Sequence, residues 1–200
     1  MANTHNIFFE FNKKIRLSRT KRDSLKISRK NLRDKIVKVF ASDSYYNPIF
    51  YGQGSFTLDT IVNPINTGDY DIDDGVYFEV ENVPEETPTT FHNWIYDAVE
   101  GYTDNISDKN PCVRVIFSDG HHVDLTIYYR IRGDHPNLAH KSDGWVESDP
   151  NEFINWFLSK LDAKKQLRRI VRYLKAWSDY KNLLGVSGLV LTILAAEKYI

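Results

Sequence analysis

A cluster of acidic residues within a strand-forming segment is the feature that most constrains what this chain of 200 residues can fold into. The cluster reads Asp69-Tyr-Asp-Ile-Asp-Asp-Gly75 and continues into a run of Val, Tyr and Phe, which predicts a strand over Tyr70–Val80. Side chains alternate between the two faces of a strand. Asp71 and Asp73 therefore share one face, and Ile72 points to the other face, into the core.

The shared face of these acids predicts a metal site. Two carboxylates about 7 Å apart on one strand face repel each other unless a cation lies between them. Magnesium is a hard cation that prefers such oxygen ligands. We predict that Asp71 and Asp73 bind Mg²⁺, with Mn²⁺ as an alternative. The pair Asp69 and Asp71 stays open, Asp74 faces away, and the competing interpretation is a solvated acidic turn that ends at Gly75.

A third carboxylate, Asp124, lies in the second strand of a predicted hairpin. Cys112–Phe117 and His121–Ile131 are rich in β-formers, and an Asp-Gly turn separates them. A lone strand Asp is usually a surface residue, but beside the first pair it completes a two-metal site for phosphoryl transfer. A zinc site at His121 and His122 is disfavoured, because adjacent strand residues face opposite sides.

The segment Tyr51-Gly-Gln-Gly-Ser-Phe56 is the third element of the pattern. Glycines at a strand-to-helix turn let backbone N–H groups approach phosphate oxygens, and Ser55 adds a hydroxyl donor. A Gly-Ser pair is usually a simple turn. Its interpretation as a phosphate-binding turn therefore depends on the acidic residues that follow it in the sequence.

The order of expected elements indicates an α+β fold with a mixed sheet and a helical C-terminal lobe. An amphipathic helix is predicted over Leu25–Phe40, and a second helix, capped by Thr89 or Thr90, reaches about Tyr102. Three further helices are expected over 151–161, 164–180 and 187–199, the first of them capped by Asp149. The connection around Pro136 is predicted to be a loop.

These elements divide the chain into three parts. Residues 1–24 are expected to form an irregular or partly helical lead-in, residues 25–148 a catalytic core, and residues 149–200 the start of a helical lobe. The last part ends inside a helical pattern without a stop signal, so we expect that lobe to be incomplete.

Composition excludes several classes of protein. The chain is 42% hydrophobic and 26% charged, with a formal net charge of −1, so no overall field draws it to nucleic acid or membranes. The basic face of the first helix, residues 26–38, is interpreted as a solubility feature, with nucleic-acid contact as the alternative. A single cysteine, Cys112, excludes an intrachain disulfide and is expected to be buried. No secretory signal or membrane span is evident, which predicts a cytoplasmic protein.

The spacing of these motifs resembles the bacterial CD-NTases, which are cyclic GMP-AMP synthase-like members of the polymerase-β-type nucleotidyltransferase superfamily. The resemblance covers roughly residues 25–200 and implies a polymerase-β-like core. It is carried by a set of short matching motifs: Gln53-Gly-Ser55, Asp71-Ile-Asp-Asp-Gly75, Cys112-Val-Arg-Val115, His122-Val-Asp124, Arg172-Tyr-Leu-Lys-Ala-Trp177 and Ser187-Gly188.

The resemblance implies roles for individual residues. The three acids Asp71, Asp73 and Asp124 would be catalytic and hold magnesium. The residues implied to bind nucleotide, mainly through its phosphates, are Gln53, Gly54, Ser55, Arg114, Lys175 and Ser187. Without the family match, Lys175 would be interpreted as a solvated helix lysine and Ser187 as a helix N-cap.

The implied activity is the condensation of nucleoside triphosphates into a cyclic di- or trinucleotide, with release of pyrophosphate, in anti-phage defence. One alternative is transfer of a nucleotide to an RNA, protein or small-molecule acceptor. Another is a non-catalytic nucleotide- or RNA-binding module. Nucleic acid is not expected to be required, and a regulatory protein partner stays open. The sequence does not define the bases used, the ring size or the linkage.

Overall fold

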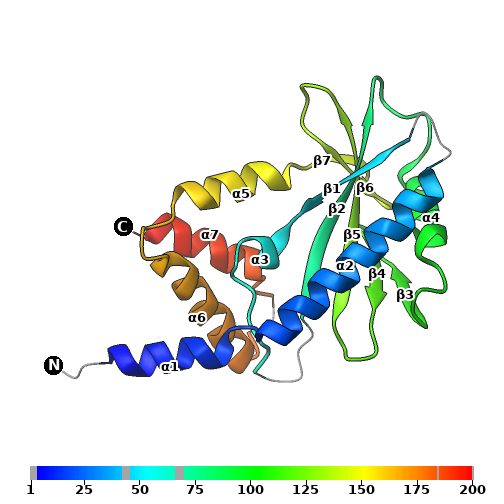
Figure 1. The fold of residues 1–200 in the computed structure, drawn as a ribbon. Coiled ribbons are helices and arrows are strands. Elements are labelled where there is room, and N and C mark those ends of the chain that lie inside the picture. Colours follow the sequence, from blue (N-terminus) through cyan, green and yellow to red (C-terminus); the bar gives the residue numbers. More distant parts are fainter. Residues whose placement is uncertain (1–3, 42–45, 66–69, 184, 200) are drawn as a thin grey trace.

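The computed structural model describes residues 4–41, 46–65, 70–183 and 185–199 of the chain (Figure 1). The described helices are α1 (His5–Ile15), α2 (Arg19–Phe40), α3 (Gly54–Thr57), α4 (Pro88–Val99), α5 (Pro150–Ser159), α6 (Gln166–Tyr180) and α7 (Gly188–Lys198). The described strands are β1 (Pro48–Gly52), β2 (Asp71–Val80), β3 (Asn105–Asp108), β4 (Val113–Ile116), β5 (His122–Ile131), β6 (Asn137–His140) and β7 (Gly144–Glu147).

The strands form one mixed sheet, which confirms the expected α+β class. Its main order is β1-β2-β5-β4-β3, and β6 and β7 extend from β5 as a hairpin. All strand pairs are antiparallel except β2 and β5, which run parallel at the centre. This parallel pair brings the two acidic segments of the sequence side by side.

Two helices, α2 and α4, cover one face of the sheet (Figure 1). Ile72 of β2 and Val123 of β5 point to this face and are fully buried in a core with Leu32 and Ile36 of α2 and Phe91 of α4. The opposite face of β2 and β5 therefore presents the intervening residues, which include the acids.

A second, smaller core joins α3 to the C-terminal helices. Phe157 of α5, Leu167 and Val171 of α6 and Ala196 of α7 pack around Leu58, which directly follows α3. This core fixes α6 beside the acidic face of the sheet. No helix among the described residues is long and apolar enough to cross a membrane.

Several element boundaries differ from the expectations. Helix α2 begins at Arg19 rather than Leu25, because Ser18 caps it by accepting a hydrogen bond from the Lys21 amide. The segment before it is largely helical, as α1. Helix α4 is capped by Thr87, not by Thr89 or Thr90, and ends at Val99.

The short strands β3, β6 and β7 were not predicted. Each has four residues, and their sequences carry few β-formers, so pairing with neighbouring strands rather than local propensity defines them. The loop expected around Pro136 therefore leads into a hairpin. The predicted strands around Asp71 and Asp124, the cap at Asp149 and the three C-terminal helices are confirmed to within about two residues at each end.

Candidate active site

The register between β2 and β5 assembles the acidic residues into one row. Asp71 pairs with His122, and Asp73 pairs with Asp124. All four side chains lie on the sheet face opposite α2, because they alternate with the buried Ile72 and its neighbours. Asp74 points the other way, to α2, where Arg33 donates to its carboxylate. Asp69 lies outside the described residues.

Glycine at position 54 is required by the closeness of Asp73. A Cβ atom on Gly54 would lie 1.7 Å from Asp73 Oδ2, far inside contact distance, and the backbone there has a φ of +63°. The preceding amide, that of Gln53, donates to the Asp73 carbonyl at 3.0 Å. The Gly-Ser turn is thereby held directly against the acidic row.

A cavity of about 590 Å³ opens beside this row. Gly54, Ser55, Asp71, Asp73 and Lys175 are among its lining residues, which brings five of the predicted site residues together. The remaining walls come mainly from the end of α6 and the start of α7. The volume is within the usual range for a small-molecule site.

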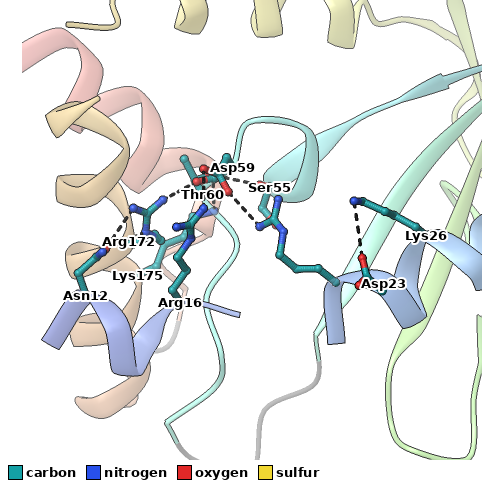
Figure 2. A network of polar contacts seen from close by, with 10 residues as sticks. Asn12, Arg16, Asp23, Lys26, Ser55, Asp59, Thr60, Arg172 and Lys175 are labelled. Atoms are coloured by element: carbon teal, nitrogen blue, oxygen red, sulfur yellow. Dashed lines mark hydrogen bonds and ion pairs between the residues drawn. The ribbon is translucent and has the colours of Figure 1, made fainter. Parts of the chain in front are cut away.

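Lys175 reaches the cavity from α6, and Thr60 positions it. Its Nζ donates to Thr60 Oγ1 at 3.5 Å (Figure 2). Gly188 leaves room for the lysine, since a Cβ there would lie 3.1 Å from its Cε. Thr60 is fully buried and was not predicted, because nothing in its sequence context distinguishes it from a turn residue.

The charges of the site are strongly coupled. Burial, together with the carboxylates of Asp71 and Asp124, raises the pKa of Asp73 to about 7. Burial also raises the pKa of Asp71. Burial lowers the pKa of Lys175 to about 8, although Asp71 and Asp73 favour its charged form. The acidic row is therefore short of positive charge, which is the condition that a bound cation relieves.

Arg114 lies beside Asp124 rather than in the cavity wall. Its Nε and Nη2 donate to the two carboxylate oxygens of Asp124 at 2.7 and 2.6 Å, across the β4–β5 pair. This bidentate bond fixes the orientation of Asp124. Each carboxylate oxygen keeps a second lone pair, so Asp124 can still contribute to a metal site. The role in nucleotide contact that the resemblance implies stays a prediction.

Two predicted nucleotide-binding residues, Gln53 and Ser187, are not among the residues that line the cavity. The Gln53 side chain is 5% exposed; its amide nitrogen donates to the Tyr77 hydroxyl, and its carbonyl accepts from the Tyr128 hydroxyl. The polar atoms of the Gln53 side chain therefore form hydrogen bonds inside the protein. Ser187 caps α7 by accepting from the Val190 amide, and it stands between residues that line the cavity rim.

His122 is a site residue that the sequence argument did not select. The rejection of a His121–His122 pair was correct, since His121 turns to Ser28 on α2. His122, however, faces the acidic row, and its Nε2 lies 3.7 Å from Asp71 Oδ2. One ligand atom each from Asp71, His122 and Asp124 lies within 4.8 Å of the others. The strand alternation that groups Asp71 with Asp73 also groups His122 with Asp124, so this contact was open to prediction.

The donor set fits a divalent cation. Carboxylate oxygens suit both magnesium and manganese. Ligand atoms of Asp71 and Asp124 lie close enough to one another and to His122 to hold such an ion. Metal binding by Asp73 stays a prediction.

Comparisons with known proteins agree with this geometry. Residues 48–128 match the family described as cyclic GMP-AMP synthase DncV-like, nucleotidyltransferase domain. The cyclic GMP-AMP synthase of Escherichia albertii is 29% identical over 163 residues, which cover 74% of this chain and 36% of that protein. The cyclic GMP-AMP synthase of Vibrio cholerae is 25% identical over 186 residues, covering 66% of this chain and 42% of that protein. The chain thus spans well under half the length of these curated relatives.

The fold is also similar to solved structures. A crystal structure of Escherichia coli DncV with bound 3′-deoxy GTP has a TM-score of 0.78 and 24% identity, covering 92% of this chain and 68% of that one. The apo form of Vibrio cholerae DncV has a TM-score of 0.81 and 23% identity, covering 98% of this chain and 72% of that one. These similarities confirm the polymerase-β-like nucleotidyltransferase fold that the motifs implied.

Proposed function

We propose that this chain, which belongs to the bacterial CD-NTase family, acts as a metal-dependent nucleotidyltransferase that joins two nucleoside triphosphates and releases pyrophosphate. The observation that carries this proposal is the row of Asp71, Asp73 and Asp124 beside a cavity that Lys175 and the Gly54–Ser55 turn also line. A binding module has no need to crowd three carboxylates on one strand pair, because their mutual repulsion destabilises the fold.

The proposed reaction forms one bond and breaks another. The 3′-hydroxyl of one nucleotide attacks the α-phosphate of a second, the bond to the β-phosphate breaks, and a carboxylate of the row accepts the hydroxyl proton. Magnesium, when bound, neutralises charge on the attacking and leaving oxygens. Asp71, Asp73 and Asp124 would hold it.

The remaining residues would bind the phosphates. Lys175, held by Thr60, is placed to neutralise the β- and γ-phosphates that leave as pyrophosphate. Ser55 and the backbone of Gly54 line the same cavity and would donate hydrogen bonds to this group. Ser187 stands at the rim of the same cavity.

We extend the proposal to the whole protein's product, a cyclic di- or trinucleotide. Support comes from the relatives, whose names describe cyclic GMP-AMP synthases. Residues 25–148 would form the catalytic core, and residues 149–200 would add Lys175 and Ser187 to it. A cytoplasmic location, anti-phage defence and a regulatory protein partner are proposed on the family resemblance.

A product assay tests the activity. The chain is incubated with radiolabelled ATP, GTP, CTP and UTP plus magnesium, and phosphatase-resistant products are separated by chromatography. We expect a resistant product that falls at least about 100-fold in Asp71→Asn/Asp73→Asn. The matched control Asp97→Asn/Glu100→Gln removes the same charge from two exposed residues, one in the last turn of α4 and one directly after it, and should leave the product unchanged.

The alternative functions give different results in this assay. A nucleotide transferred to an added RNA, protein or small-molecule acceptor, with no cyclic product, would identify a different nucleotidyltransferase. RNA binding that is sensitive to salt and survives loss of all three acids would identify a binding module instead.

A further inference from the structure

A second cavity, of about 550 Å³, lies between α1 and the start of α6 on the outer side of the catalytic cleft. Its walls carry seven basic side chains and a single carboxylate, that of Asp59. The seven are Lys13, Arg16, Lys164, Lys165, Arg168, Arg169 and Arg172. Figure 2 shows the inner end of this basic pocket, where Arg16 and Arg172 converge on Asp59.

The carboxylates in and beside the pocket already form ion pairs with basic side chains. Asp59 lies 2.9 Å from an Arg22 nitrogen and 3.6 Å from an Arg16 nitrogen. Lys13 pairs with Glu10 at the pocket edge, at 2.8 Å. Arg172 uses its hydrogen bonds on neutral partners, the Asp59 carbonyl and the Asn12 side chain.

Five of the seven basic side chains form no ion pair within the described part of the chain: Lys164, Lys165, Arg168, Arg169 and Arg172. Arg169 donates only to the Gln166 side chain and the Lys164 carbonyl. The Nε of Arg168 is buried and, among the described residues, has no hydrogen-bond partner. A buried guanidinium N–H without an acceptor is costly, so an anion in the pocket would satisfy it.

Positive charge concentrated in a concave pocket attracts multivalent anions far more strongly than the same charges spread over a surface. Because the whole chain has a net charge of −1, this field is local to the pocket. Burial, with the nearby Arg16 and Arg169, lowers the pKa of Arg172, although Asp59 favours its charged form.

Aromatic rings complete the lining. His5, Phe8 and Phe9 of α1 and Tyr173 of α6 face the pocket. Phe8 and Phe9 are 50% and 48% exposed. Phe8 already packs against Tyr173, with ring centroids 5.3 Å apart, and Lys13 lies 4.4 Å from the centre of the Phe9 ring, so a planar partner would contact the remaining exposed surface of the two rings. Basic groups beside exposed aromatic rings are the combination that binds phosphates and stacks a base.

We propose that this pocket is a second nucleotide site, in which the basic side chains bind the oligophosphate and the rings of α1 contact the base. The site is separate from the catalytic cleft and needs no metal. Its binding does not depend on the proposed activity of the cleft.

The pocket is also connected to the catalytic cleft. Leu58 and Thr60 line the cleft, and Asp59 between them lines the basic pocket. Asp59 has a φ of +56°, a conformation that is unfavourable for a residue with a side chain, and Arg172 holds its carbonyl at 2.5 Å. A nucleotide that binds Arg16 and Arg172 would therefore compete with their contacts to Asp59. Asp59 directly precedes Thr60, the hydrogen-bond partner of Lys175 in the cleft.

Fluorescence anisotropy of a ribose-labelled ATP, measured in EDTA on the full chain, tests the proposal. We expect Arg168→Gln/Arg169→Gln to weaken binding at least about tenfold, because two charged hydrogen-bond donors are lost. Lys30→Gln/Lys38→Gln, which removes equal charge from the exposed side of α2, should change affinity by less than about twofold. Because Lys175→Met removes a phosphate contact of the cleft, the loss in Arg168→Gln/Arg169→Gln is also measured in a Lys175→Met background, where it should persist.

A second variant separates binding from folding. Lys164→Gln/Lys165→Gln alters two exposed residues before α6 and should also weaken binding, with an unchanged melting temperature. Unlabelled ATP should displace the probe better than inorganic triphosphate, because the rings add base contact. Equal displacement by triphosphate overturns the base contact. Equal losses in the α2 control, a loss that disappears in the Lys175→Met background, or displacement by an RNA oligonucleotide but not by ATP overturns the nucleotide site.

Discussion

Substitution of Gly54 by alanine tests whether the Gly-Ser turn positions the metal ligands. The new Cβ would lie 1.7 Å from Asp73 Oδ2 and 2.6 Å from its Cγ, so the carboxylate must move. The backbone at this position, with φ of +63°, adds strain that any residue with a Cβ bears. Left-handed strain costs about 1–2 kcal/mol, and overpacking adds about 1–3 kcal/mol.

Gly101 provides the matched control. Its φ is +70°, nearly that of Gly54, but a Cβ there meets no atom within 4 Å. Gly101→Ala should therefore cost only the strain, about 1–2 kcal/mol. The difference between the two variants, about 1–3 kcal/mol, measures the clash with Asp73.

Urea unfolding in EDTA gives the two stabilities, and calorimetry gives Mn²⁺ affinity. We expect Gly54→Ala to weaken Mn²⁺ binding at least about tenfold, because the displaced Asp73 carboxylate no longer converges with Asp71. Gly101→Ala should bind Mn²⁺ like the unchanged chain. Equal stability losses and equal Mn²⁺ affinities in both variants would show that the turn does not hold Asp73 in place.

Three further results are expected. Because the pKa of Asp73 is raised to about 7 in the folded state, the metal-free chain prefers the protonated carboxyl and should lose stability from about pH 5 to pH 8. Magnesium should raise the melting temperature more at pH 8 than at pH 5.5, and an equal rise would contradict this. Arg114→Lys replaces a bidentate bond to Asp124 by a single one and should lower nucleotide incorporation about tenfold, with little change in melting temperature. Burial raises the pKa of Cys112 to about 12, so a disulfide reagent should label it at pH 8 only in urea; rapid labelling of the folded chain would refute that burial.

Local patterns were sufficient to predict the strands that carry the acids and the shared face of Asp71 and Asp73. Alternation along β2 separates Asp71 and Asp73 from Ile72 and Asp74, and the Asp-Gly turn defines the hairpin that carries Asp124. These features depend on neighbours in sequence, through strand period and turn chemistry. These features of the site can therefore be predicted from one sequence.

Other features depend on partners that are distant in sequence. Gln53 is turned inward by Tyr77 and Tyr128, which lie on two different strands. Nothing near Gln53 in the sequence distinguishes an amide that bonds two tyrosines from one that faces a phosphate. Thr60 likewise becomes part of the site only because α6 brings Lys175 to it. Short strands such as β6 depend on pairing with β5 in the same way.

The parallel pairing of β2 and β5 has a consequence for folding kinetics. Asp73 and Asp124 become neighbours only when a loop of about fifty residues closes, since parallel strands cannot form through a tight hairpin. Such long-range pairing is slow to form. We therefore expect no metal affinity in the early, hairpin-containing states of the chain. Magnesium should then slow unfolding while leaving the folding rate nearly unchanged, because it binds an arrangement that forms after the rate-limiting step.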